Sequence, residues 1–171
     1  MIAILLNDAS FEQDIRELLM AFYPGETFTH KEEEAGEAEL IVRGVRDGNS
    51  FSLDVAPVKK EAVHFALIYP DFSNRFETKN EIKQTLYRLL SAQTGRELPW
   101  GTLTGIRPTK IALTKLYDGW TDEQIETYMR ETYFTSKEKI DLSIDVAERE
   151  RRLLSTIDYE NGYSLYVGIP F

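Results

Sequence analysis

The chain has 171 residues, enough for one ordinary domain or two small ones, and its 42% hydrophobic content allows a packed core. The net charge of −9 argues against a general nucleic-acid binder, which needs a basic face, so we expect no nucleic-acid partner. The chain contains no cysteine, no stretch resembling a signal peptide and no run of ~20 apolar residues, so we expect a cytoplasmic protein without a membrane partner.

The first elements are a strand and a helix. Residues 2–6 are continuously apolar, which indicates a buried strand. A helix follows, for which Ser10 and Gln13 predict a capping box and Pro24-Gly25 predicts the end. Its apolar residues recur at helical spacing and predict a buried face: Phe11, Ile15, Leu18, Leu19 and Phe22.

Several strands are predicted next. Residues 26–30 are read as a short strand, and residues 40–45 and 51–55 as a hairpin around Asp47-Gly48-Asn49. Residues 63–69 predict a further strand. Between the first two of these segments, the acidic run Glu32-Glu33-Glu34 is interpreted as a solvated loop.

A second, longer helix follows these strands. Thr78 and Glu81 predict a capping box at its start, and Gly95 predicts a left-handed residue at its end. Strand, helix, several strands and helix make an α+β layout, with a mixed sheet and two packed helices.

The sequence from Arg107 onward predicts only helices. Pro108 suits a first helical turn. The pairs Thr121/Gln124 and Thr135/Glu138 predict capping boxes for two more helices. Short linkers indicate that these helices pack as antiparallel neighbours in a small helical subdomain.

The loop that leads into these helices is the best candidate for a binding site. Gly101 and Gly105 allow close backbone approach, and Arg107 and Lys110 add positive charge at the amino end of a helix. This combination is typical of an anion site. Two interpretations stay open: the loop binds a carboxylate of a substrate or of another domain, or Arg107 anchors two subdomains while the glycines turn the chain. Neither His30 nor His64 has neighbours that would predict a metal site.

The last residues, 163–171, alternate apolar residues with Tyr166 and Gly168, which indicates a strand. A strand this apolar needs sheet neighbours on both sides. We expect it to be the beginning of a further domain that continues past Phe171.

Two motifs carry a resemblance to a known family. Tyr166-Val167-Gly168-Ile169-Pro170-Phe171 resembles the first barrel strand of radical S-adenosylmethionine (SAM) enzymes of the oxygen-independent coproporphyrinogen III oxidase type. The wider family has His where this chain has Gly168, a departure that resembles the HemZ, or coproporphyrinogen dehydrogenase, branch. The stretch Pro99-Trp100-Gly101-Thr102-Leu103-Thr104-Gly105-Ile106-Arg107-Pro108-Thr109-Lys110 is similar to the same branch.

The layout of the elements predicts an α+β accessory domain at 1–97 and a helical subdomain at 98–158, and the resemblance implies a truncated first barrel strand at 159–171. It also implies that the intact protein carries out oxidative decarboxylation of coproporphyrinogen III in haem biosynthesis, with a [4Fe–4S] cluster, SAM and an electron donor. Tyr166 is the position that the resemblance places beside SAM. The cluster cysteines would lie beyond Phe171, so these residues alone are expected to be inactive, with no catalytic residue and no metal, and to pack against the barrel of the same chain.

A second interpretation gives this region another role. Small α+β domains that precede catalytic domains can recruit macromolecules, so the region could be an RNA- or protein-binding module fused to a radical SAM enzyme with a different substrate. The acidic composition weighs against RNA.

Overall fold

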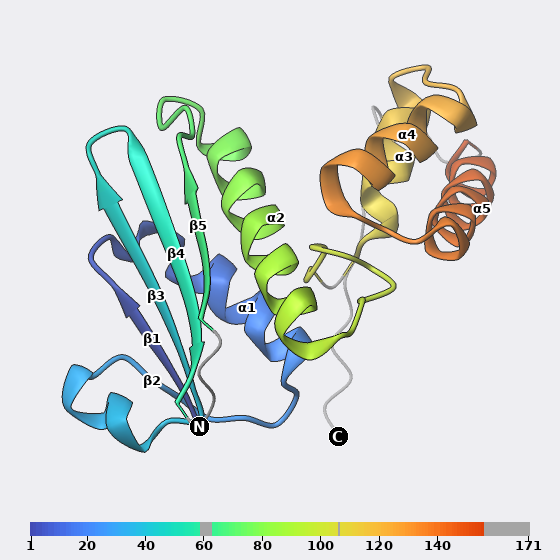
Figure 1. The fold of residues 1–171 in the computed structure, drawn as a ribbon. Coiled ribbons are helices and arrows are strands. Elements are labelled where there is room, and N and C mark those ends of the chain that lie inside the picture. Colours follow the sequence, from blue (N-terminus) through green and yellow to red (C-terminus); the bar gives the residue numbers. More distant parts are fainter. Residues whose placement is uncertain (59–62, 106, 156–171) are drawn as a thin grey trace, which may run out of the picture.

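The computed structural model describes residues 1–58, 63–105 and 107–155 (Figure 1). It confirms the predicted α+β class: a five-stranded mixed sheet and its helices are followed by further helices. The strands are β1 (Ile2–Leu6), β2 (Phe28–Thr29), β3 (Leu40–Asp47), β4 (Ser50–Pro57) and β5 (His64–Ile68). The helices are the 3₁₀ segments η1 (Ala9–Phe11) and η2 (Glu32–Glu37), and α1 (Glu12–Phe22), α2 (Arg75–Thr94), α3 (Thr109–Tyr117), α4 (Asp122–Tyr133) and α5 (Lys137–Leu154).

The sheet has the strand order β2-β1-β3-β4-β5. β1 is central among the parallel strands, because both β2 and β3 pair with it in parallel. β3, β4 and β5 then form an antiparallel meander, and Gly48 takes φ +57° in the predicted hairpin turn. Parallel neighbours need a crossover connection, and α1 provides it between β1 and β2.

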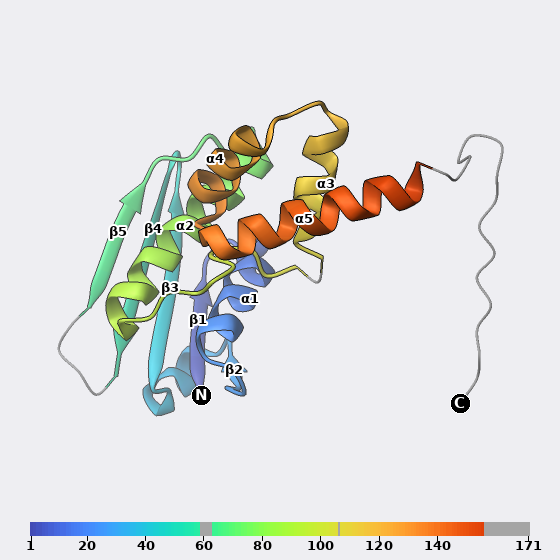
Figure 2. The same ribbon diagram turned by 90° about the vertical axis from the view of Figure 1, so that its right-hand side faces the viewer.

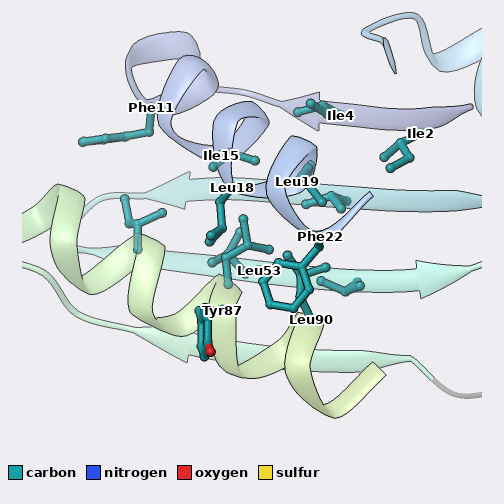
Figure 3. Packing of buried hydrophobic residues seen from close by; sticks show 14 of the residues in the cluster. Ile2, Ile4, Phe11, Ile15, Leu18, Leu19, Phe22, Leu53, Tyr87 and Leu90 are labelled. Atoms are coloured by element: carbon teal, nitrogen blue, oxygen red, sulfur yellow. The ribbon is translucent and has the colours of Figure 1, made fainter. Parts of the chain in front are cut away.

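The main hydrophobic core lies between one face of the sheet and the helices α1 and α2 (Figure 3). The predicted apolar face of α1 is confirmed, since Ile15, Leu18, Leu19 and Phe22 are all fully buried. α2 contributes a matching apolar face of Ile82, Leu86, Tyr87 and Leu90. Amphipathic helices gain most of their stability from burying such a face.

The opposite face of the sheet is covered only in part. A small cluster joins Ala3 and Leu5 of β1 to Ala35 and Ala38 at η2. The acidic run at the start of η2 was predicted to be a solvated loop, but it forms the first turn of this short helix. Glu32 and Glu33 are exposed, as expected. Over β5 the outward side chains are exposed.

The helices α3, α4 and α5 form a separate group of helices (Figure 2). They surround a second hydrophobic cluster. Its buried members are Ala112, Leu116, Ile125, Met129, Ile140, Ile144 and Ala147. α5 packs against both α3 and α4, and α4 also contacts α2. Of the helices described, none is both long and apolar enough to cross a membrane.

The predicted capping boxes of the first two helices are wrong. Asp8 accepts from the Ser10 amide at the start of η1, and α1 begins after Phe11 without a side-chain cap. α2 begins one turn earlier than predicted, because the Asn74 side chain accepts from the Glu77 amide. Asp and Asn compete with Ser and Thr for the same role, and the fold selects the residue whose backbone is extended at that point.

The later helix boundaries are closer to the prediction. Gly95 ends α2 in the left-handed conformation at φ +66°, as expected. The predicted cap of α5 is wrong by one residue: Ser136 accepts from the Lys139 amide, whereas Thr135 is buried with its hydroxyl 3.5 Å from the Trp100 carbonyl oxygen.

The capping box of α4 is confirmed in both directions. The Thr121 hydroxyl accepts from the Gln124 amide at 3.3 Å, and the Gln124 side chain accepts from the Thr121 amide at 2.9 Å. We expect Thr121→Ala to lower the free energy of unfolding by about 1 kcal/mol, because amide donors of the first turn lose an acceptor. Urea unfolding followed by circular dichroism measures this. Thr127→Ala, a position inside α4 away from the cap, is the control and should cost less than about 0.5 kcal/mol.

Candidate functional site

The candidate site lies where the segment from Leu98 to Gly105 passes between α2 and the end of α4. The Gly101 amide donates to the Leu98 carbonyl at 2.8 Å, and the Thr102 amide donates to the Tyr133 carbonyl at 2.7 Å. Gly101 is buried and takes φ +57°. A Cβ at Gly101 would overlap the Tyr133 carbonyl oxygen and lie 2.6 Å from the Phe134 carbonyl group. Glycine is therefore required here by both conformation and space.

Further hydrogen bonds hold the helical unit against α2. The Gln84 side chain donates to the carbonyls of Glu131 and Thr132 at 3.2 and 2.8 Å, which satisfies acceptors at the end of α4. The Leu98 amide donates to the Tyr87 hydroxyl at 2.9 Å. Phe134 leaves α4 with φ +58° and packs its ring against Tyr87 at 5.6 Å between centroids. Backbone, amide and aromatic contacts thus join the two hydrophobic clusters through one junction.

A buried lysine completes the junction. Lys83 of α2 is only 7% exposed, and its Nζ donates to the Thr104 hydroxyl at 2.9 Å. The Thr104 hydroxyl in turn donates to Glu17 Oε2 on α1 at 2.8 Å. The hydroxyl accepts from the ammonium and donates to the carboxylate, so it links α1, α2 and the loop in one relay (the Lys83–Thr104–Glu17 relay).

The surroundings of the relay lower the pKa values of both its charged residues, Lys83 and Glu17. Desolvation lowers the pKa of Lys83, and the carboxylates of Asp14 and Glu17 oppose that shift. Burial by itself would raise the pKa of Glu17, but hydrogen bonds from Thr104 and Gln13 and the charge of Lys83 bring this pKa below its usual value. Each partner therefore favours the charged state of the other.

A cavity of about 240 Å³ opens beside the relay. It lies between α1, α2 and the loop, and its polar lining includes Asp14, Glu17, Lys79, Lys83, Thr104 and the backbone of Gly105. Two ammonium and two carboxylate groups give it a balanced charge. The cavity can therefore accept a small polar group, but its charge does not by itself select an anion.

The structure separates the four residues predicted for an anion site. Gly101 is packed against α4, whereas Gly105 is exposed at the mouth of the cavity. Arg107 forms an ion pair with Glu150 of α5, and Lys110 is exposed in the first turn of α3. Arg107 thus binds a carboxylate of its own helical unit, and of the four only Gly105 lines the cavity. Whether this loop binds a ligand stays a prediction.

Sequence reasoning missed Glu17, Lys83 and Thr104. Glu17 and Lys83 each stand directly beside apolar core residues of a helix, where a charged residue is normally read as solvent-exposed. No sequence pattern links them to Thr104, because the three residues come together only when the loop folds back over α1 and α2.

Tyr166 and the predicted terminal strand lie outside the described residues. Within the described ranges, no three His, Asp or Glu side chains are grouped so that they could hold a metal ion. The described part of the chain is thus a sheet-and-helix unit and a helical unit joined by a polar junction.

Comparison with known proteins confirms the resemblance stated from the sequence. The chain is 34% identical over 112 residues to the oxygen-independent coproporphyrinogen-III oxidase-like protein HemZ of Bacillus subtilis (strain 168). The match covers 63% of this chain and 22% of that relative, so the chain corresponds to a minor part of the relative's length. No family model and no solved structure matches the chain.

Proposed function

We propose that this chain is the amino-terminal accessory region of a radical SAM enzyme that converts coproporphyrinogen III to protoporphyrinogen IX in haem biosynthesis. The observation that carries the proposal is the 34% identity over 112 residues to a coproporphyrinogen-III oxidase-like protein. The motif from Pro99 to Lys110, which resembles the same branch, supports it further.

The residues present do not fit the cofactor that this class of enzyme uses. A radical SAM cluster is held by cysteine thiolates, and this chain has no cysteine. The cluster, most of the SAM site and the electron-donor site would belong to other residues of the intact protein. Tyr166 remains the proposed contact of this chain with SAM.

For the described residues we propose a role as a rigid accessory unit that packs on the catalytic part and contributes to substrate binding. The junction supports rigidity, because hydrogen bonds from Gln84, Leu98, Thr102 and Lys83 tie the loop and the helical unit to α1 and α2. The proposed contact surface is the amino end of α3. The Arg107 side chain is 61% exposed there. N–H groups of its guanidinium can therefore also donate to a carboxylate of the substrate or of the barrel.

The test uses the intact protein, reduced and supplied with SAM. We expect it to consume SAM and to convert coproporphyrinogen III to protoporphyrinogen IX. Arg107→Ala is expected to raise the KM for coproporphyrinogen about tenfold, the loss of about one charge-assisted hydrogen bond. Arg130→Ala, which removes a similarly exposed arginine paired with Glu126 inside α4, is the matched control and should leave KM unchanged.

Three results would count against the proposal or a part of it. Absence of any turnover of coproporphyrinogen by a protein that consumes SAM would reject the substrate. A shift of bulk tRNA mobility by the intact protein at moderate salt would favour the macromolecule-binding alternative. An unchanged KM for Arg107→Ala in an active enzyme would limit this residue to its ion pair with Glu150.

A further inference from the structure

The strand β5 forms one edge of the sheet and differs from ordinary edge strands. Within the described residues, nothing pairs with its outer edge. Edge strands usually carry charged residues or proline, or are very short, and so avoid pairing with other molecules. The opposite edge follows this rule, since β2 has two residues. β5 has five residues, HFALI, none of them Asp, Glu, Lys, Arg or Pro.

The outward side chains of this strand and its flanks form an apolar row. Val63 is 59% exposed, Phe65 60%, Leu67 47% and Tyr69 71%. These residues alternate, so they share the face of the sheet that lies away from α1 and α2. Exposed apolar residues are common singly, but four in one row along an open edge indicate an interaction surface.

Polar and charged residues stand beside this row on the neighbouring strands. On the neighbouring strand, Asp54 stands opposite Phe65 and Ser52 stands opposite Leu67. Asp54 in turn stands opposite Arg43 of β3. Beyond β5 the face therefore carries Arg43 and Asp54 beside the exposed Val45, and a second layer stacked on it would bury these charged groups. A strand added at the edge would instead contact the apolar row and satisfy the open backbone groups.

The sequence of this strand matches itself in antiparallel register. If Ala66 of one copy pairs with Ala66 of another, Phe65 stands opposite Leu67 and Val63 stands opposite Tyr69. Aromatic residues then meet aliphatic ones across the strands, which is a favourable cross-strand pairing. His64 stands opposite Ile68, so no like charges oppose each other despite the net charge of −9.

We propose that β5 is a homodimer interface, in which the β5 strands of two copies pair antiparallel about a two-fold axis at Ala66. The interaction is isologous, since the same strand is used by both copies. It joins two five-stranded sheets into one continuous sheet. This inference is independent of the proposed enzymatic activity.

The absence of cysteine from the chain allows a direct test. In the proposed register, Ala66→Cys brings the two thiols within disulfide distance, since directly paired Cα atoms lie about 4.5–5.5 Å apart. His64→Cys is the matched control, because its two thiols would be about 13 Å apart at the strand rise per residue. Under mild oxidation we expect the covalent dimer to form at least about tenfold faster for the variant at 66. Equal rates for the two variants would overturn the register.

Sedimentation equilibrium of the unmodified chain tests the association itself. We expect a reversible dimer, and Leu67→Lys should raise its dissociation constant about tenfold or more, because the symmetric interface loses the contact twice. Leu142→Lys places the same change on α5, where Leu142 is 44% exposed, and should leave the constant unchanged. A monomer at all concentrations up to about 1 mM, or equal effects of both lysines, would overturn the proposal.

Discussion

Gly101→Ala is expected to lower the free energy of unfolding by about 4 kcal/mol, a large effect for the addition of a single methyl group. Alanine at φ +57° is strained, and its Cβ would overlap the Tyr133 carbonyl oxygen and crowd the Phe134 carbonyl group. Both obstacles are backbone atoms at the end of α4, so a side-chain rotation cannot relieve them. Relief would require the loop to move away from α4 and break the hydrogen bond from the Thr102 amide to Tyr133.

Gly95→Ala is the control that separates the backbone strain of a positive φ from the steric overlap of the added Cβ. Gly95 has a similar φ of +66°, but nothing lies within 4 Å of the position that a Cβ would occupy there. We expect this control to lower the free energy of unfolding by only about 1 kcal/mol, the strain of a left-handed alanine. Urea unfolding of both variants by circular dichroism measures the difference. Equal losses for the two variants would contradict a steric overlap between a Cβ at position 101 and the Tyr133 carbonyl oxygen.

Thr104→Val is expected to lower the free energy of unfolding by about 2–3 kcal/mol. Valine has nearly the same shape but cannot accept from Lys83 or donate to Glu17. The ammonium of Lys83, which is 7% exposed, would then lack its hydrogen-bond acceptor. Leaving a buried ammonium without its hydrogen-bond acceptor costs more than the hydrogen bond contributes.

A double variant tests this reason. Lys83→Met removes the charge and keeps the length of the side chain, so the pair Lys83→Met with Thr104→Val is expected to recover at least about half of the loss. Thr114→Val, at an exposed position of α3, is the control for the exchange of a hydroxyl for a methyl group and should change stability by less than about 0.5 kcal/mol. Additive losses in the double variant would contradict the relay.

The relay also predicts how the stability depends on pH. The pKa of Glu17 is lowered in the folded chain, so its contribution is complete above its ordinary value of 4.5 and is lost as the pH falls through the folded value. Thr104→Val removes one of the hydrogen bonds that lower this pKa. The free energy of unfolding of this variant should therefore depend less steeply on pH in the acidic range. The pKa of Lys83 is lowered too, so its burial opposes folding at neutral pH and the stability gains as the pH rises toward 10.5.

The local patterns predicted the elements well, and their boundaries less well. Turn residues between two apolar segments predicted the β3–β4 hairpin, and helical spacing predicted the buried face of α1. Three of four capping boxes were misplaced, because several Ser, Thr, Asn and Asp residues stand near each helix start. The backbone path, which depends on the packing of the whole helix, selects among them.

The candidate site was predicted only in outline. The loop from Gly101 to Lys110 stands out in the sequence, either as an anion site or as a turn anchored by Arg107, but neither interpretation includes Lys83. In the structure Arg107 forms an ion pair with Glu150. The charged group that contacts the loop is the Lys83 ammonium, which donates to the Thr104 hydroxyl. The partner of a charged side chain depends on which elements meet in space, and spacing along the chain does not contain that information.

The amino-acid sequence by itself determined the α+β class, the order of the elements and the relationship to a coproporphyrinogen-III oxidase-like protein. Hydrophobic periodicity and short motifs are local properties, so they can be read along the chain. Only the tertiary structure decided that β1 lies at the centre of the parallel strands, that Gly101 must be glycine, and that β5 has an open edge. These depend on contacts between residues far apart in the sequence, which exist only after the chain has packed.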